Sequence, residues 1–393
     1  MPGAATATSR EPGAIRFDPL GPRHTGTLVQ TADPCARNTH TRVVTARVSD
    51  EMPRLGHDPD ASDVASMPIG ASGAQWPRKV YCSPMSLAVR LLGTSASRPT
   101  IERNVASLAV VREGETLLFD CGEGTQRQMM RYGVSFGLED IFFTHFHADH
   151  VIGVIGLMRT MALQGRTEPL RLWGPRGGAR MLKRAEEFGM DRVTFPVEII
   201  ELEPGVPVAR KDYAIVPFAV DHRGARALGY TVVEADRKGR FNPELARELG
   251  VPEGPSWGEL HRGRAVTLAD GRVIEPSVLV GAPRAGRKVV VTGDTRPCRA
   301  TIEAARDADL LVHEATFGDE EGARAVETGH STAREAATVA AEAGVRSLVL
   351  VHFSARYSRD ATDLGREARE VFEATLVGKD GMEIQVPYRE STT

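Results

Sequence analysis

Four short apolar segments of this chain each end at an aspartate or a histidine. Asp120 follows LLF, His145 follows IFFT, Asp294 follows VVVTG and His352 follows LVLV. Runs of this length, rich in β-branched and aromatic residues, are typical of buried strands. Loops at strand ends gather groups from distant parts of an α/β chain, and ligands bind there. The pattern therefore predicts a layered α/β fold with a binding site at one edge.

Predicted strands and helices alternate behind residue 85. Residues 106–120 predict two strands joined at Glu113-Gly114, a hairpin signal. Further strands are predicted at residues 140–145, 170–174, 228–235, 288–294, 309–315 and 346–352. Helices are predicted at residues 151–163, 179–189 and 332–344, and the last has a capping box from Thr332 to Glu335. The second half repeats the plan of the first, so two similar α/β halves are expected.

The sequence THFHADH, residues 144–150, concentrates three histidines and one aspartate directly after a predicted strand. Without partners in a protein interior, these polar groups would each cost free energy. Imidazole and carboxylate donors without thiolate are typical of zinc sites, with manganese or iron less favoured. The candidate ligands are His145, His147, Asp149, His150, His222, Asp294 and His352. Seven donors exceed one tetrahedral shell, so two metal ions are expected, and Asp120 is expected to orient a histidine ligand.

Composition excludes several classes of protein. The formal net charge of -3 argues against nucleic-acid binding by bulk positive charge. No apolar run approaches the ~18 residues that a membrane span requires, and the N-terminus lacks the features of a secretion signal. The four cysteines, Cys35, Cys82, Cys121 and Cys298, show no CxxC and no disulfide-like spacing. We therefore expect a protein of the reducing cytoplasm without a membrane partner.

Residues 1–84 differ in composition from the rest of the chain. They are rich in Ala, Thr, Pro, Gly, Arg and Asp and show neither strand nor helix periodicity. Such a segment buries too little apolar surface to offset the entropy of ordering, so a disordered N-terminal extension is expected. A transit peptide is a less favoured alternative because of Glu11, Asp18 and Asp33. The predicted catalytic domain covers residues 85–388, and residues 389–393 form a tail.

The order of motifs along the chain resembles that of a known family. THFHADH resembles the signature of the metallo-β-lactamase superfamily. Further stretches resemble ribonuclease Z, the tRNA 3′-processing endonuclease: LGTSASRPTIERNVAS (92–107), LLFDCGEGTQRQMMR (117–131), VTGDTRPC (291–298), LVHEATF (311–317), HSTAREAA (330–337) and VHFSARY (351–357). The resemblance covers about residues 86–388. It implies an αββα four-layer sandwich with a dinuclear zinc site at its edge.

The resemblance also implies a role for each candidate ligand. The first zinc ion takes His145, His147 and His222, the second takes Asp149, His150 and His352, and Asp294 bridges both. Two zinc ions per subunit lower the pKa of a shared water to roughly 7 in such sites. Asp149 is expected to orient that water or accept its proton, and His330, held by Glu314, to protonate the departing oxygen. The implied products are tRNA with a 3′-hydroxyl and a trailer with a 5′-phosphate.

Residues 236–288 are too polar and too rich in Gly and Pro for a sheet core. They contain ten Lys/Arg and seven Asp/Glu, a local charge of +3 in a chain of net charge -3. Within them, PEGPSWGELHRGRAVTLADGR (252–272) resembles the exosite arm with which ribonuclease Z grips precursor tRNA. The implied tRNA contacts are Gly254, Pro255, Arg262 and Arg264. The resemblance further implies a homodimer, in which the arm of one subunit serves tRNA bound at the site of the other.

Other functions fit parts of the pattern. A small-molecule phosphodiesterase or arylsulfatase-like hydrolase would keep the zinc ligands but lack the arm. A non-catalytic RNA-binding scaffold would tolerate loss of ligands, whereas all seven are present. A solvated surface insertion is the alternative to a tRNA-binding arm at residues 236–288. The complete ligand set and the arm together favour the tRNA endonuclease.

Overall fold

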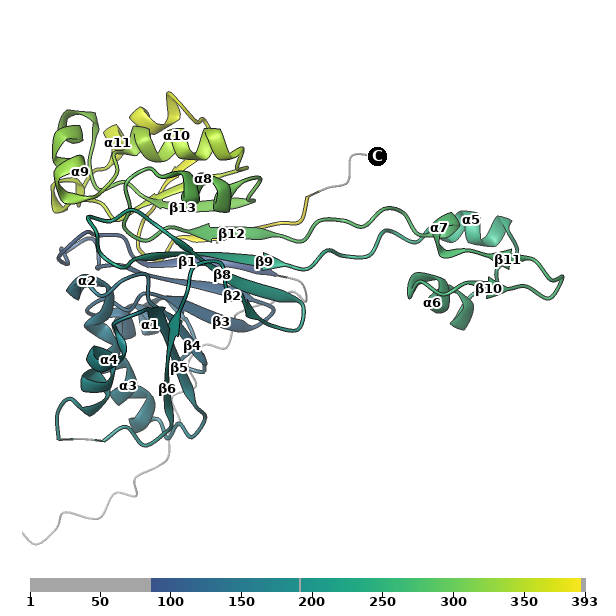
Figure 1. Cartoon of the computed structure of the whole chain (residues 1–393), viewed down its shortest axis with the longest axis horizontal. Helices are drawn as coiled ribbons and strands as arrows, with labels where there is room; N and C mark the ends of the chain where they lie inside the picture. Colours follow the sequence, from purple (N-terminus) through teal and green to yellow (C-terminus); the bar gives the residue numbers. More distant parts are fainter. Residues whose placement is uncertain (1–85, 191, 390–393) are drawn as a thin grey trace, which may run out of the picture. The chain divides into compact units, whose positions relative to one another are not determined.

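The computed structural model describes residues 86–190 and 192–389. The predicted extension, residues 1–84, and residues 390–393 of the predicted tail lie outside the described residues. Two seven-stranded sheets organise the described part of the chain (Figure 1). Apolar side chains fill the space between the sheets, and helices pack on the outer face of each. The predicted order of helix, sheet, sheet and helix layers is confirmed.

The first sheet has the strand order β16-β1-β2-β3-β4-β5-β6. Its strands are β1 (Leu87–Gly93), β2 (Ser107–Arg112), β3 (Glu115–Phe119), β4 (Asp140–Phe142), β5 (Leu170–Pro175), β6 (Val197–Leu202) and β16 (Glu383–Gln385). The predicted hairpin joins β2 and β3, and Glu113 and Gly114 in its turn have φ angles of 49° and 93°. Such two-residue turns need positive φ at both positions, which explains the glycine. Strands β3 to β6 are parallel, so their carboxyl ends meet at one edge.

The second sheet has the strand order β15-β14-β13-β12-β9-β8-β7. Its strands are β7 (Val208–Ala209), β8 (Tyr213–Ala219), β9 (Leu228–Glu234), β12 (Lys288–Val291), β13 (Leu310–Glu314), β14 (Leu348–Val351) and β15 (Thr375–Val377). Strands β12 to β15 are parallel to one another. Their carboxyl ends therefore also meet at one edge of the sheet.

The main core lies between the two sheets. Tyr230 of β9 packs against Phe119 and Phe142 of the first sheet, with ring centroids 5.5 Å apart in both pairs. Two further apolar clusters lie on the outer faces of the sheets. In one, α1, α3 and α4 pack on the first sheet, and in the other, α8, α10 and α11 pack on the second sheet. These helices are α1 (Thr125–Tyr132), α3 (Gly153–Leu163), α4 (Ala179–Glu187), α8 (Arg299–Ala305), α10 (Ala333–Ala343) and α11 (Thr362–Arg369).

The helices largely follow their sequence signals. The capping box of α10 is confirmed: the Thr332 side chain accepts a hydrogen bond from the Glu335 amide, and the Glu335 carboxylate accepts one from the Thr332 amide. The helix predicted at residues 151–163 differs, because it is divided into α2 (Ala148–Val151) and α3. A Cβ at Gly153 would lie 1.9 Å from the Gly122 carbonyl oxygen, so the glycine permits this close approach. The earlier start places the end of the histidine motif on a helix.

An insertion of residues 236–288, called the arm below, connects β9 to β12 (Figure 1). It contains α5 (Pro243–Glu248), α6 (Pro255–His261), β10 (Val266–Thr267), β11 (Val273–Ile274) and α7 (Pro276–Leu279). A separate apolar cluster, which includes Ala246, Leu260 and Leu279, holds these elements together. Among the described residues, no helix is long and apolar enough to cross a membrane.

Candidate metal centre

All seven predicted ligands follow strands at the edge where the parallel strands end. His145 and His147 lie between β4 and α2, Asp149 and His150 lie in α2, His222 follows β8, Asp294 follows β12, and His352 follows β14. Asp120 and His352 come directly after a strand and have φ angles of 56° and 60°. This left-handed conformation is uncommon outside glycine and clusters at functional sites. The chain turns sharply at these residues.

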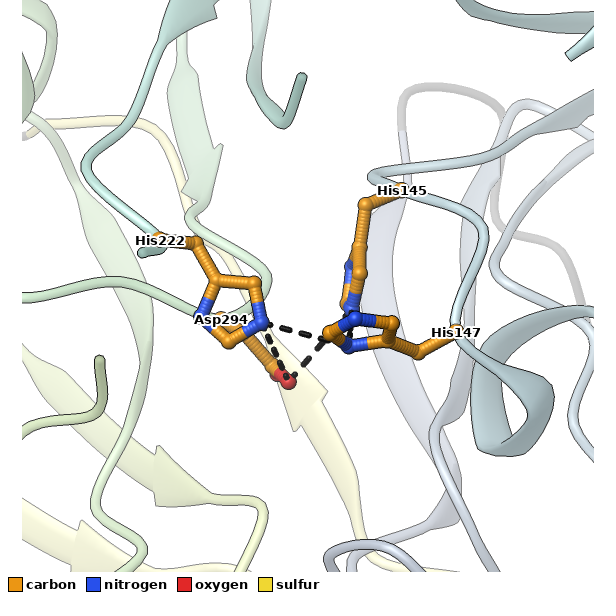
Figure 2. A group of neighbouring side chains, drawn as sticks. All are labelled: His145, His147, His222 and Asp294. Atoms are coloured by element: carbon orange, nitrogen blue, oxygen red, sulfur yellow. Dashed lines mark hydrogen bonds and ion pairs between the residues drawn. The ribbon is translucent and has the colours of Figure 1, made fainter. Parts of the chain in front are cut away.

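Three ring nitrogens and a carboxylate oxygen form a first group (Figure 2). His147 Nδ1 lies 2.9 Å from His145 Nε2 and 3.2 Å from His222 Nε2. Asp294 Oδ2 lies 3.6 Å from the same His145 nitrogen and 4.0 Å from the same His222 nitrogen. The four candidate ligand atoms lie within 4.8 Å of one another, a separation that a shared metal ion accounts for.

A second group lies on the other side of Asp294. His150 Nε2 and His352 Nε2 are 3.4 Å apart, and Asp149 Oδ2 lies 3.6 Å and 3.5 Å from them. Asp294 Oδ1 lies 3.3 Å from the His150 nitrogen and 3.2 Å from the His352 nitrogen. The two oxygens of Asp294 therefore face different groups, as a bridging carboxylate does.

Outer partners determine which nitrogen of each buried histidine faces the centre. His150 Nδ1 lies 2.8 Å from Asp120 Oδ2, and His222 Nδ1 lies 2.9 Å from the Gly329 carbonyl oxygen. His352 Nδ1 lies 2.9 Å from Thr316 Oγ1. Acceptors at Nδ1 hold the proton there and leave Nε2 free to ligate. Asp120 thus lies against a candidate ligand, and its orienting role stays a prediction.

Two threonines in this outer layer were not identified from the sequence. The Thr144 hydroxyl donates to Asp120 Oδ2 and lies 3.1 Å from His145 Nδ1. The Thr316 hydroxyl donates to Glu314 Oε2 at 2.7 Å, so it accepts from His352 Nδ1. Each hydroxyl therefore links a carboxylate to a histidine. The sequence could have indicated them only by their position: Thr144 precedes His145 in THFHADH, and Thr316 lies two residues after Glu314 in HEATF.

The charges of the centre fit divalent cations. Burial raises the pKa of Asp294, but His352 and His150 hold it well below its usual value. Burial lowers the pKa of His150, yet Asp294 and Asp120 raise it well above its usual value. The carboxylates therefore stabilise positive charge here, which cations supply when the histidines are neutral. Asp294 Oδ1 is buried and has no hydrogen-bond partner among the described residues, although such atoms nearly always have one. A ligand role accounts for that oxygen.

His330 and Glu314 lie beside the second group. His330 Nδ1 lies 2.8 Å from Glu314 Oε1, and its ring stacks on that of His352 at 5.3 Å between centroids. The Glu314 side chain is 1% exposed and that of His330 is 13% exposed, so the histidine is the member of the pair that solvent can reach. Burial alone would lower the pKa of His330, but the Glu314 carboxylate has the larger effect and raises it to about 9. The ring therefore carries a proton at neutral pH.

The predicted tRNA contacts lie in the arm and not at the metal centre. Gly254 precedes α6 with a φ of 102° and a ψ of −125°, a conformation that favours glycine, and Pro255 begins the helix. Arg262 and Arg264 are exposed, and both form ion pairs with Glu259. The predicted site residues therefore fall into two sets, the candidate ligands at the strand ends and the predicted tRNA contacts in the arm.

Comparison with known proteins identifies the family of this chain. A family model described as a beta-lactamase superfamily domain matches residues 115–280 and 276–353. A ribonuclease Z of Gemmatimonas aurantiaca is 66% identical over 307 residues, which cover 78% of this chain and 98% of the relative. A ribonuclease Z of Myxococcus xanthus is 55% identical over 305 residues, which cover 77% of this chain and 99% of the relative.

A solved structure agrees with these sequence relationships. The crystal structure of the short form of human tRNase Z has a TM-score of 0.55 and is 27% identical, covering 76% of this chain and 99% of that chain. The predicted fold class and family are thereby confirmed. The chain belongs to the ribonuclease Z family of the metallo-β-lactamase superfamily.

Proposed function

We propose that this chain is a zinc-dependent endoribonuclease that removes the 3′ trailer from precursor tRNA. The observation that carries the proposal is the convergence of seven histidine and aspartate side chains from separate strands, with the His330–Glu314 pair beside them. Relatives named ribonuclease Z, at 66% and 55% identity over nearly their whole length, support the tRNA substrate. The products are tRNA with a 3′-hydroxyl and a trailer with a 5′-phosphate.

Two zinc ions per subunit fit the donor set. His145, His147 and His222 would hold one ion, Asp149, His150 and His352 the other, and Asp294 both. When bound, such ions act as Lewis acids that lower the pKa of water and neutralise charge on the phosphoryl oxygens. Imidazole and carboxylate donors without thiolate favour zinc.

Asp149 is proposed to orient the attacking water or to accept its proton. One of its oxygens, Oδ2, accepts a hydrogen bond of 2.7 Å from the Ser97 amide, which restricts rotation of the carboxylate. Burial raises the pKa of Asp149, but His352 and His150 lower it by more, so the group is a carboxylate at neutral pH. A charged, oriented carboxylate is suited to this role.

His330 is proposed to protonate the oxygen that leaves phosphorus. Attack by water forms a new P–O bond, the bond from phosphorus to the 3′ oxygen of the tRNA breaks, and that oxygen takes a proton. The His330 ring is protonated at neutral pH and is held by Glu314. Arg296 Nη1 also donates to the His330 carbonyl oxygen at 2.6 Å, which fixes the backbone. Positioned acids of this kind contribute roughly 10²- to 10⁴-fold to rate.

The arm is proposed to bind the body of the tRNA, with Gly254, Pro255, Arg262 and Arg264 as contacts. Phosphate contacts position a substrate without reading its sequence, which suits an enzyme that acts on many tRNAs. We further propose a homodimer in the cytoplasm, from the same resemblance and from the cysteine pattern. Light scattering of the purified protein would measure the mass of the assembly.

Incubation of the purified protein with a 3′-extended precursor tRNA tests the function. We expect one endonucleolytic cut, a 3′-hydroxyl on the tRNA, a 5′-phosphate on the trailer and loss of cleavage with a chelator. Zinc content near two per chain is expected. No cleavage of any precursor, or stepwise trimming from the 3′ end, contradicts the proposal.

A small-molecule phosphodiesterase of the same superfamily is the alternative. It would hydrolyse bis(p-nitrophenyl) phosphate efficiently and leave precursor tRNA intact. A non-catalytic RNA-binding scaffold would bind precursor tRNA but hydrolyse neither substrate. The same two-substrate assay therefore separates all three functions.

A further inference from the structure

The arm consists of two parts with opposite charge. We call residues 236–242 and 279–287 the stalk, and residues 243–278 the tip; the last residue of the arm, Lys288, begins β12. The stalk contains five Lys/Arg and one Asp, a net charge of +4. The tip contains four arginines and six Asp/Glu, a net charge of -2. The positive charge predicted for the arm as a whole is therefore carried by the stalk.

The two segments of the stalk pair as an antiparallel ribbon (Figure 1). Arg237 and Arg284 exchange two backbone hydrogen bonds of 2.8 Å, and the Gly281 amide donates to the Arg240 carbonyl oxygen at 2.9 Å. A Cβ at Gly239 would lie 1.7 Å from the Gly281 carbonyl oxygen, so this approach requires glycine. These hydrogen bonds hold the two segments that carry the cationic residues side by side.

Contacts at the base fix the stalk to the catalytic body. The buried Arg287 guanidinium donates two hydrogen bonds of 2.8 Å to Glu234, at the end of β9. The ring of Tyr388, from the segment after β16, lies between Arg237 and Arg287, with guanidinium carbons 3.3 Å and 3.9 Å from its centroid. Cation–π contacts on both faces of one ring therefore connect the carboxyl-terminal segment to the stalk.

The arginines of the tip already have carboxylate partners. Arg247 pairs with Glu253 at 2.7 Å, and Arg272 pairs with Asp270 at 2.7 Å. Arg262 and Arg264 share Glu259. Exposed ion pairs are weak, so they can open, but the partner carboxylate then repels an approaching phosphate. Six carboxylates make the tip a poor surface for a polyanion.

Three cations of the stalk differ in this respect. Within residues 86–190 and 192–389, Lys238, Arg240 and Arg284 form no ion pair. Lys238 and Arg240 are exposed and lie between the bridges that Arg237 and Phe241 form to the other segment of the stalk.

We propose that the stalk, and not the tip, is the phosphate-binding surface of the arm, with Lys238, Arg240 and Arg284 as its contacts. The partner is the sugar–phosphate backbone of the tRNA body. This inference rests on the proposed function and refines it, since it moves the electrostatic contact from Arg262 and Arg264 to the base of the arm. The tip then contributes contacts that depend little on salt.

Two triple variants of the full chain test the inference. One is Lys238→Gln/Arg240→Gln/Arg284→Gln in the stalk, and its matched control is Arg247→Gln/Arg262→Gln/Arg264→Gln in the tip. For each, kcat/KM for precursor tRNA is measured at sub-saturating substrate across a series of KCl concentrations. Turnover of bis(p-nitrophenyl) phosphate and the melting temperature confirm that the centre and the fold are intact.

The stalk variant is expected to reduce the slope of log kcat/KM against log salt by about two to three, because each lost phosphate contact removes about 0.9 from it. The tip variant should change it by less than about one. A charge-conserving variant, Lys238→Arg/Arg240→Lys/Arg284→Lys, should restore the slope. An unchanged slope in the stalk variant, or an equal loss in the tip variant, overturns the inference while cleavage persists. Absence of precursor cleavage by the unaltered chain would instead contradict the proposed function as well.

Discussion

The metal centre and the arm both depend on charged or titratable side chains, but in opposite physical settings. At the centre, His145, His150, His222, Asp294 and His352 are all 4% exposed or less. In the arm, Arg262 and Arg264 are exposed and share one carboxylate. Lys238 and Arg240 are exposed and form no ion pair within the part of the chain that the structure describes. Buried charges must be satisfied by fixed partners, whereas exposed charges cost little and can exchange partners. Position therefore matters at the centre, and total charge matters in the arm.

This difference predicts two kinds of response to mutation. At the centre, each oxygen of Asp294 faces ring nitrogens of more than one histidine, so a single substitution leaves several buried groups unsatisfied. In the arm, each cation contributes separately to attraction of a polyanion, so effects are small singly and add together. The predictions below run from the largest expected effect to none.

The largest effect is expected for Asp294→Ala. Both oxygens of Asp294 face candidate ligands, so its loss separates the two groups of donors. Cleavage should fall by more than the roughly 10- to 100-fold that loss of an outer partner costs. Zinc content by atomic absorption should fall below two per chain, while circular dichroism stays close to that of the unaltered protein. Asp149→Ala should behave similarly, and full activity in either variant would contradict the ligand assignment.

A smaller effect is expected for Asp120→Asn. The Asp120 carboxylate accepts from the Thr144 amide and hydroxyl and from His150 Nδ1, but it does not face the other ligands. The asparagine amide keeps the shape of the carboxylate and loses its charge, so the affinity for zinc should fall about 10- to 100-fold. Competition with a chromophoric chelator measures this, and excess zinc should restore cleavage. An unchanged zinc affinity would show that the carboxylate does not orient His150.

A still smaller effect is expected at the base of the arm. Tyr388→Ala removes the ring between Arg237 and Arg287, and each cation–π contact is worth about 0.5–2 kcal/mol. KM for precursor tRNA should rise a few fold, with turnover of bis(p-nitrophenyl) phosphate unchanged. Tyr388→Phe keeps the ring and should leave both substrates unaffected. Equal KM values for the alanine and phenylalanine variants would remove this contact from the account.

No effect is expected from removal of residues 1–84. They lie outside the described residues, and their composition predicts a disordered extension. A chain that begins at Met85 should keep its melting temperature and its cleavage of precursor tRNA. Loss of either would show that the extension contributes to the fold or to the site.

Local signals in the sequence predicted much of the fold. The hairpin at Glu113-Gly114 and the cap of α10 depend on neighbouring residues, and both are confirmed. The division between α2 and α3 was missed because the Gly153 amide donates to the carbonyl oxygen of Cys121, which is distant in sequence, and not within the helix. Periodicity within a helix cannot signal such an approach.

The candidate ligands were predictable for a related reason, since each follows an apolar strand and its residue type is chemically restrictive. Thr144 and Thr316 were missed because threonine is common and acts here only through its neighbours in space. The pairing of the stalk and its contact with Tyr388 also depend on segments distant in sequence. Net charge over residues 236–288 indicated a basic arm but could not locate the charge within it.

One measurement tests most directly the claim that the metal centre hydrolyses the phosphodiester and the arm binds the tRNA. Residues 236–285 are replaced by an Asn-Gly turn, which keeps Arg287 because its guanidinium satisfies the buried Glu234. The kcat/KM values for precursor tRNA and for bis(p-nitrophenyl) phosphate are then compared with those of the unaltered chain. We predict a steep fall for precursor tRNA, mainly through weaker binding, and retained hydrolysis of the small phosphodiester. Cleavage of precursor tRNA at the unaltered rate under sub-saturating conditions, or loss of both activities, would contradict the account.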